Sequence, residues 1–229
     1  MPALLIFLLV FLLTLLPGDV VNNDKKSFAQ INQELIAWDN QQHFSLAEFN
    51  QRRQDFSELI TYYLDQIDHK LSEEEMEHLI KESNRYDIPP EILIKLLKTE
   101  SNFDKDTIGP RTQYGHAYGI AQFMENTAPW IASMANLEYE MEYLFDPIYS
   151  ITLAATYLNY LQYGDGQGHE GFHDWHASLT AYNRGVAGLN SYVRNHQTTV
   201  SRFSNTIINQ AEAIALEEDN QEITEVSFR

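Results

Sequence analysis

The sequence predicts an all-α protein. Apolar residues recur at intervals of three and four along most of the chain, which is the spacing of one face of a helix. No stretch sustains the alternation of apolar and polar residues that is typical of a half-buried strand. Start and stop signals separate the periodic stretches, such as Ser72 with Glu75 at one start and Gly164 at one end.

Composition limits the classes of protein that the chain can belong to. Its 229 residues are enough for one good-sized domain with extensions. The absence of cysteine excludes both a disulfide framework and a thiolate metal site. The net charge is −18, from 33 acidic and 15 basic residues, and such a surface repels phosphate backbones. We therefore do not expect nucleic acid as a partner.

The first residues form an apolar segment. Residues 3–16 are apolar apart from Thr14, and this length is short for a membrane span but matches the apolar core of a signal peptide. We predict that residues 1–18 are a signal peptide or a membrane anchor. No basic residue precedes the segment and no clear cleavage site follows it, so both remain open, as does a buried N-terminal helix.

Residues 19–71 predict a helical extension without chemistry of its own. Their apolar residues indicate two amphipathic helices with a break near residues 40–45. The next helix has a strong start, because Ser72 and Glu75 form a capping box and Leu71 and Met76 a hydrophobic staple. We expect this helix to run to about Arg85.

The following helix carries a glutamate at the C-terminal end of its apolar face. Pro90 suits its first turn. At about 100° per residue, Leu93, Leu96 and Leu97 lie on the side of Glu100, and Lys95 and Lys98 lie opposite. Burial and the negative helix end both disfavour an ionised Glu100, which predicts a raised pKa and a carboxyl group that donates a proton near neutral pH. The alternative is a glutamate that extends from the edge of the face into water.

The remaining elements follow from the same signals. We predict a loop at 102–119, a helix at 121–134 kinked at Pro129, a helix at 148–163, a flexible glycine-rich loop at 164–171, one or two helices at 175–192, a helix at 202–216 and a fraying acidic tail at 217–229.

Three motifs stand in order along these elements: Glu100-Ser101-Asn102-Phe103, Tyr118-Gly119-Ile120-Ala121-Gln122-Phe123-Met124-Glu125-Asn126-Thr127-Ala128 and Leu179-Thr180-Ala181-Tyr182-Asn183-Arg184-Gly185. With Asp146-Pro147 and the helix after it, they resemble the catalytic domain of the soluble lytic transglycosylases, a lysozyme-like family that cleaves peptidoglycan. The resemblance covers about residues 72–213. It implies a lysozyme-like transglycosylase domain at residues 72–216.

The chain departs from the family pattern in three places. Ile120-Ala121 stand where Leu-Met is usual, which preserves apolar packing. Glu125 replaces a proline and adds a charge near the expected cleft, where it could alter substrate preference or the pKa of the acid. Residues 113–116 look like a small insertion.

The resemblance implies a role for each matched residue. Glu100 would be the catalytic acid and base, and the substrate-binding residues would be Ser101, Gln122, Tyr182, Asn183, Tyr118 and Gly119. Amides suit sugar hydroxyls and acetamides, and glycine lets the backbone approach a ligand. Structural alternatives stay open, namely Tyr182 as a core residue, Asn183 as a helix cap and Ser101 as a cap of the last turn.

Two further sets of residues have the chemical character of a site. Glycosidases commonly use two carboxylates, but the resembling family works with one, and we do not expect Asp104, Asp106 or Glu125 to be a second. The three histidines at 169, 173 and 176 would face one way in a helix, but the glycines among them favour a loop. We therefore predict no metal site and no cofactor.

Together, the resemblance implies a lytic transglycosylase that cuts the β-1,4 bond between N-acetylmuramic acid and N-acetylglucosamine in peptidoglycan glycan strands and leaves 1,6-anhydro ends. It would be an exported protein of the periplasm or cell envelope, either free or associated with the membrane through residues 3–16. A hydrolytic muramidase and a non-catalytic wall-binding assembly subunit are the alternatives, and an intact Glu100 argues against the second of these.

Overall fold

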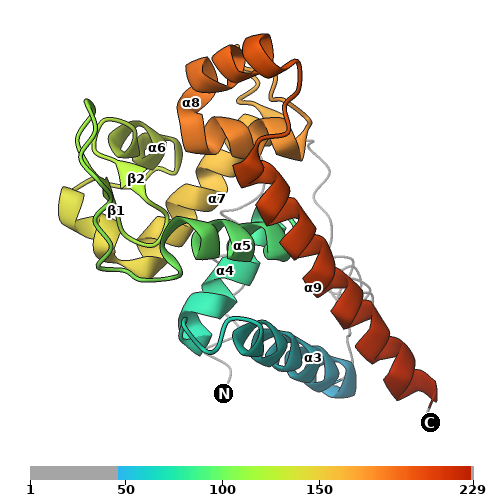
Figure 1. Ribbon diagram of the computed structural model, residues 1–229. Helices are drawn as coiled ribbons and strands as arrows, with labels where there is room; N and C mark the ends of the chain where they lie inside the picture. Colours follow the sequence, from blue (N-terminus) through green and yellow to red (C-terminus); the bar gives the residue numbers. More distant parts are fainter. Residues whose placement is uncertain (1–45, 228–229) are drawn as a thin grey trace, which may run out of the picture. The chain divides into compact units, whose positions relative to one another are not determined.

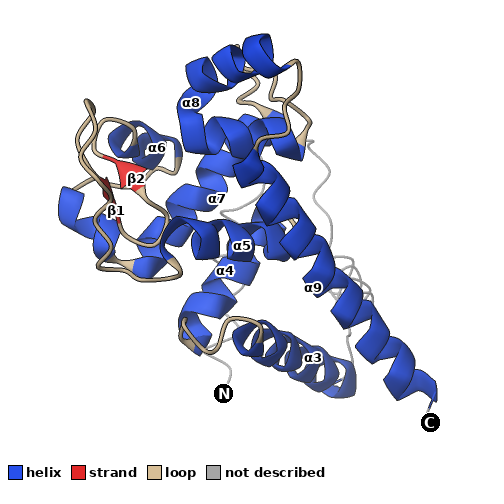
Figure 2. Cartoon of the chain, viewed as in Figure 1, coloured by secondary structure: helices blue, strands red, loops and turns tan. Residues whose placement is uncertain are grey.

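The computed structural model describes residues 46–227, and this part of the chain is mostly helical, as the sequence predicts (Figures 1 and 2). Its elements are α3 Leu46–Asp65, α4 Glu73–Arg85, α5 Pro90–Ser101, β1 Ala117–Tyr118, β2 Phe123–Met124, α6 Ala128–Met134, the 3-10 helix η1 Met141–Phe145, α7 Pro147–Tyr163, α8 Trp175–His196 and α9 Arg202–Ser227.

The chain divides after Arg53 into two units, and the second, Gln54–Arg229, contains the core and the candidate site. The predicted apolar segment at 1–18 and the first helix of the extension lie outside the described residues. Helix α3 corresponds to the second predicted helix of the extension. Among the described helices, none combines the length and the apolar character that crossing a membrane requires.

Helix α4 begins as its sequence predicts. The Glu75 backbone N–H donates to Ser72 Oγ at 3.2 Å, and the Ser72 N–H donates to Glu75 Oε2 at 2.7 Å, which completes the capping box. Leu71 and Met76 are both buried on either side of this cap. These contacts stabilise the helix start by satisfying N–H groups that have no partner within the helix.

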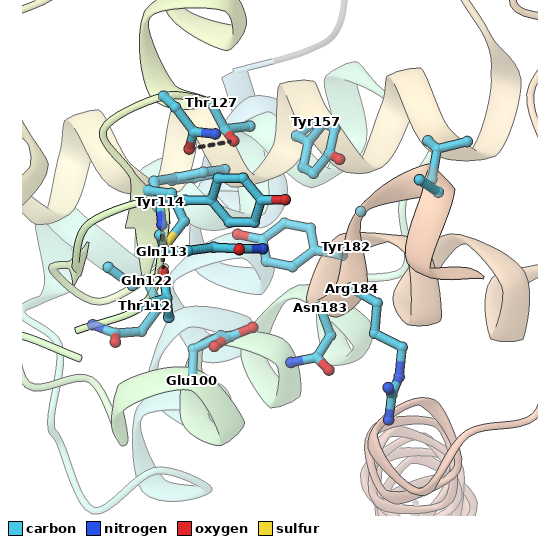
Figure 3. Close-up of a pocket in the computed structure, with 17 residues that line it drawn as sticks. Glu100, Thr112, Gln113, Tyr114, Gln122, Thr127, Tyr157, Tyr182, Asn183 and Arg184 are labelled. Carbon is cyan, nitrogen blue, oxygen red and sulfur yellow. Dashed lines mark hydrogen bonds between the residues drawn. The ribbon is translucent and has the colours of Figure 1, made fainter. Parts of the chain in front are cut away.

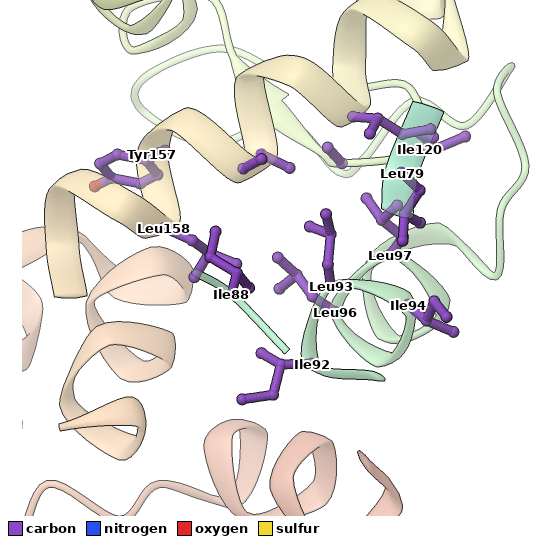
Figure 4. Packing of buried hydrophobic residues seen from close by; sticks show 14 of the residues in the cluster. Leu79, Ile88, Ile92, Leu93, Ile94, Leu96, Leu97, Ile120, Tyr157 and Leu158 are labelled. Carbon is purple, nitrogen blue, oxygen red and sulfur yellow. The ribbon is translucent and has the colours of Figure 1, made fainter. Parts of the chain in front are cut away.

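Helix α5 is buried on more sides than predicted. It packs against α4 and α9, and its residues from Glu91 to Leu97 are all buried. Figure 4 shows the apolar residues of this stretch within the core. Lys95, on the side opposite Glu100, is buried as well, since only 7% of its surface is accessible. Helix α9 packs along α5 and so adds to the burial of this helix.

The predicted helix at 121–134 is wrong in its first half. The chain instead turns at Gly119 and Gln122, which both have positive φ, and β1 pairs antiparallel with β2. Helix α6 begins only at Ala128, with Pro129 in its first turn. Proline suits that position because its missing N–H would have had no helical partner, so it marks a start here and not a kink.

The C-terminal helices follow the predicted order with one difference in length. Helix α7 ends at Gly164 as predicted, and α8 contains a break at Gly185, where φ is 70°. Helix α7 packs against α4, α6 and α8, so it contacts helices that come both before and after it in the chain. Helix α9 continues to Ser227, through the segment predicted to fray.

Candidate active site

One pocket of about 720 Å³ lies where the end of α5 meets the β1–β2 hairpin and the break in α8. Its volume is in the range of ligand-binding clefts. Figure 3 shows the Glu100 carboxyl at its base, with Gln122 and Thr112 on one side and Asn183 and Arg184 on the other. The full lining is Glu100, Thr112, Gln113, Tyr114, Ala117, Gln122, Phe123, Met124, Asn126, Thr127, Tyr157, Tyr182, Asn183, Arg184, Gly185, Val186 and Ala187.

Glu100 reaches this pocket because α5 ends directly after it. Asn102 adopts the left-handed conformation at φ 56°, and its N–H donates to the Lys98 carbonyl at 2.9 Å. Asparagine tolerates this conformation better than most residues, so the chain turns away here. The Glu100 side chain is left half-buried at the base of the pocket.

Burial raises the pKa of Glu100 to about 8, from an ordinary value of 4.5. Burial is the cause of this shift, and no cation or hydrogen-bond donor among residues 46–227 offsets it. The carboxyl group is therefore protonated at neutral pH and can donate its proton. The predicted effect of Glu125 on this pKa is absent, since Glu125 is not among the causes of the shift.

Glu100 is the one carboxylate among the residues that line this pocket. Asp104, Asp106 and Glu125 are all exposed outside it, and Glu125 accepts a hydrogen bond from the Tyr118 hydroxyl at 2.6 Å. The described residues thus offer the pocket one group that can act as acid and base, and no second carboxylate that could act as a nucleophile.

The break in α8 shapes the wall opposite the hairpin. Tyr182 and Asn183 come just before Gly185, and both line the pocket. The Tyr182 hydroxyl donates to the Ala121 carbonyl at 3.0 Å, so this residue has a structural contact while its ring faces the pocket. Asn183 is exposed in the pocket wall and lies two residues before the break in α8, close to the end of the first helical part.

Gln122 also lines the pocket, but its amide nitrogen is already used. It donates to the carbonyls of Thr107 at 3.2 Å and Gly119 at 2.8 Å. The sequence predicts a group that offers a ligand both a donor and an acceptor, whereas here the oxygen Oε1 is left for a ligand. The positive φ of Gln122, 51°, is held by these two contacts.

Three predicted binding residues do not line the pocket, and their roles toward substrate stay predictions. Ser101 Oγ donates to the Ile120 carbonyl at 2.9 Å and joins α5 to the turn before β2. Tyr118 contacts Glu125, as described above. Gly119 packs so tightly that an added Cβ would lie 1.8 Å from the Leu144 carbonyl oxygen. Glycine is therefore required here by packing against η1.

A loop that the sequence presents as an insertion supplies part of the pocket wall. Thr112, Gln113 and Tyr114 all line the pocket, and Tyr114 is 61% exposed. Thr112 Oγ1 donates to the Gly115 carbonyl at 3.0 Å and accepts from the Tyr114 N–H at 3.1 Å, which fixes this turn. Only the polar turn composition signals such a loop, and it does not indicate where the loop will lie.

The three histidines diverge. The rings of His169 and Tyr160 stack at 4.4 Å, His173 lies near Tyr163, and His176 Nδ1 contacts Ser204 Oγ at 3.2 Å. Over the range 46–227, no three His, Cys, Asp or Glu side chains come together as ligands for a metal ion.

The model of the Transglycosylase SLT domain family matches residues 77–204, which is more than half of the chain. This range contains Glu100 and every residue that lines the pocket. No curated protein matches the chain.

Two solved structures are similar to the chain. One is the lytic transglycosylase Slt of Pseudomonas aeruginosa, an inactive mutant with glutamine in place of a glutamate, at 18% identity and a TM-score of 0.51, over 82% of this chain and 30% of that one. The other is the 70 kDa soluble lytic transglycosylase of Escherichia coli, at 19% identity and a TM-score of 0.40, over 80% of this chain and 32% of that one. The chain spans about a third of the length of these proteins, and the first likeness supports the fold.

Proposed function

The chain belongs to the Transglycosylase SLT domain family, and on this premise we propose that it is a lytic transglycosylase of peptidoglycan. Its substrate would be the glycan strand, cut at the β-1,4 bond between N-acetylmuramic acid and N-acetylglucosamine. The observation that carries this proposal is a single carboxyl group, Glu100, in a pocket of suitable size, with its pKa raised to about 8 by burial.

In the first step, neutral Glu100 donates its proton to the glycosidic oxygen as the bond from that oxygen to C1 breaks. Positive charge develops on the sugar that keeps C1. The acetamide oxygen of that sugar is placed to stabilise C1, and Tyr182 and Asn183 line the wall where the acetamide would lie. The inactive glutamate-to-glutamine mutant of the Pseudomonas protein fits an essential acid of this kind.

In the second step, the Glu100 carboxylate takes the proton of the C6 hydroxyl of the same sugar, and O6 bonds to C1. The products are a strand with a free 4-hydroxyl and a strand with a 1,6-anhydro end, and Glu100 is neutral again. No water is consumed. A well-oriented intramolecular hydroxyl has an effective molarity of about 10⁵–10⁸ M, so cyclisation is expected to outcompete water.

The mass of the products tests this proposal. Purified peptidoglycan is digested with the protein, and the released muropeptides are analysed by mass spectrometry before and after borohydride reduction. We expect products lighter by one water than hydrolysed muropeptides and insensitive to borohydride. Mainly reducing ends would instead identify a hydrolytic muramidase. We further propose that the protein is exported to the cell envelope, where this substrate is found.

A further inference from the structure

A row of aromatic side chains leads out of the pocket across α7. We call it the aromatic strip, and it consists of Tyr182, Tyr157, Trp130, Tyr160 and His169. Successive ring centroids along it lie 5.4, 6.0, 5.0 and 4.4 Å apart. Its first two members line the pocket and face the same space in Figure 3. The strip is therefore continuous with the candidate active site.

Trp130 is the most exposed member of the strip. It is 45% exposed, although burial of a tryptophan side chain would contribute strongly to stability. The rings of Tyr157 and Tyr160 meet it at 80° and 89°, so it is held from two sides. A rigid aromatic surface of this kind loses little conformational entropy when a ligand binds.

The outer end of the strip is fixed by a turn, although the sequence predicts a flexible loop there. Asp165 Oδ1 accepts hydrogen bonds from the backbone N–H groups of Gln167 at 2.8 Å and His169 at 3.0 Å. The ring of His169 then stacks on Tyr160 with an angle of 30° between the planes. Beyond it lies a hollow of about 650 Å³ lined by Tyr163, Gly166, Gly168, His169 and Glu170.

The chemistry of the strip suits neutral sugar rings. A β-linked pyranose presents C–H groups on its ring faces and hydroxyls at its edge, so its faces stack on aromatic rings while its edge stays in water. Only His169 among the five members has a side chain that can become a cation. The chain has a net charge of −18, which disfavours binding of a polymer of phosphates. The hydroxyl of Tyr160, which is half-buried, can also meet sugar hydroxyls.

We propose that the aromatic strip is a second glycan-binding surface, which holds sugar rings of the strand beyond the ring at Glu100. This inference rests on the proposed function and extends it, because it makes the enzyme select long strands over short ones. Sugar rings added to the substrate along the strip would contact Trp130, its most exposed member, until this surface is filled.

The test uses the full chain with Glu100→Gln, so that bound glycan is not cleaved. Affinity for N-acetylglucosamine oligomers of increasing length is measured by calorimetry, with and without Trp130→Ala. We expect the affinity of the parent to rise with length, and Trp130→Ala to lower it about tenfold for the longest oligomers only. Tyr143→Ala is the matched control, because Tyr143 is 41% exposed on η1 and contacts Tyr149 instead of the strip.

A second variant keeps the test decisive if Trp130→Ala is poorly folded. Trp130→Phe retains an aromatic face and is expected to keep most of the affinity for long oligomers. The strip proposal is overturned if the alanine variant, the phenylalanine variant and the Tyr143→Ala control all show the length dependence of the parent. If the parent binds no oligomer and no intact glycan strand, the proposed function itself fails, which is a different outcome.

Discussion

Helix α5 carries a glutamate near each end, buried in the first turn and half-buried in the last, and the two ends differ in what surrounds the carboxyl group. Glu91, in the first turn, is 9% exposed and accepts a hydrogen bond from the Tyr63 hydroxyl of α3. Glu100, in the last turn, faces a pocket and has its pKa raised to about 8 by burial. The same residue type on one helix is thus satisfied by the protein at one end and left available to a ligand at the other.

The helix itself contributes to this difference. The negative end of its dipole lies at the last turn and disfavours a carboxylate at Glu100. A hydrogen bond to the charged form stabilises it, whereas burial without a partner stabilises the neutral form. We infer that Glu91 serves the fold and Glu100 the chemistry, and three predictions test this division.

The largest effect is expected from Glu100→Gln, which removes the transferable proton and keeps the shape of the side chain. General acid–base catalysis contributes about 10²–10⁴-fold, and here one group would act in both steps, so we expect peptidoglycan cleavage to fall by at least about a hundredfold. The folded state should hold or gain stability, because glutamine is neutral in both states, whereas Glu100 ionises more readily in the unfolded state than in the buried site. Release of soluble muropeptides and thermal unfolding measure both effects. Activity near that of the unmodified protein would refute the assignment of Glu100 as the acid.

Much of this comparison was predictable from the sequence, because it depends on local signals. The capping box of α4, Pro90 at the start of α5 and the glutamate at its end are read directly from spacing. The order of the motifs then indicated the family, and it placed Glu100, Gln122, Tyr182 and Asn183 near one another. All four line one pocket in the structure, while their roles toward substrate remain predictions.

What the sequence did not show depends on long-range packing. Lys95 is only 7% exposed, and its helix packs against α9, which comes more than a hundred residues later in the chain. In the hairpin before α6, Gly119 lies tightly against Leu144, and this contact has no local sign in the sequence. The turn at Thr112 is a wall of the pocket only because the whole loop folds over it. Periodicity reports which residues are apolar, but not which element will cover them.

The second prediction concerns stability as a function of pH. In the folded protein the pKa of Glu100 is about 8, against an ordinary value of 4.5. Between these values the folded state binds the proton and the unfolded state does not, so stability is greatest below about pH 4.5 with respect to this group and falls as pH rises through about 8. The loss should reach a few kcal/mol, since each pKa unit corresponds to about 1.4 kcal/mol.

Urea unfolding of the unmodified protein and of Glu100→Gln, at about pH 5 and about pH 8.5, measures this loss. All other groups titrate in both proteins, so the difference between their unfolding free energies isolates Glu100. We expect the variant to become relatively more stable at the higher pH. An equal difference at both pH values would show that the pKa of Glu100 is not raised, and the contrast with Glu91 would then disappear.

The smallest effect is expected from Glu91→Gln, the same chemical change at the other end of α5. The amide oxygen can still accept from the Tyr63 hydroxyl, but the bond loses its charged partner and the helix start loses a favourable negative group. We expect a loss of about 1 kcal/mol in the free energy of unfolding, because hydrogen bonds to charged groups exceed neutral ones by about that amount. Turnover of peptidoglycan should stay within about twofold of the unmodified protein, since Glu91 does not line the pocket.

Tyr63→Phe provides the matched partner variant and should cost a similar amount of stability with equally unchanged turnover. A loss of turnover in Glu91→Gln as large as that in Glu100→Gln, with the fold intact, would show that the two ends of α5 do not divide structure from chemistry.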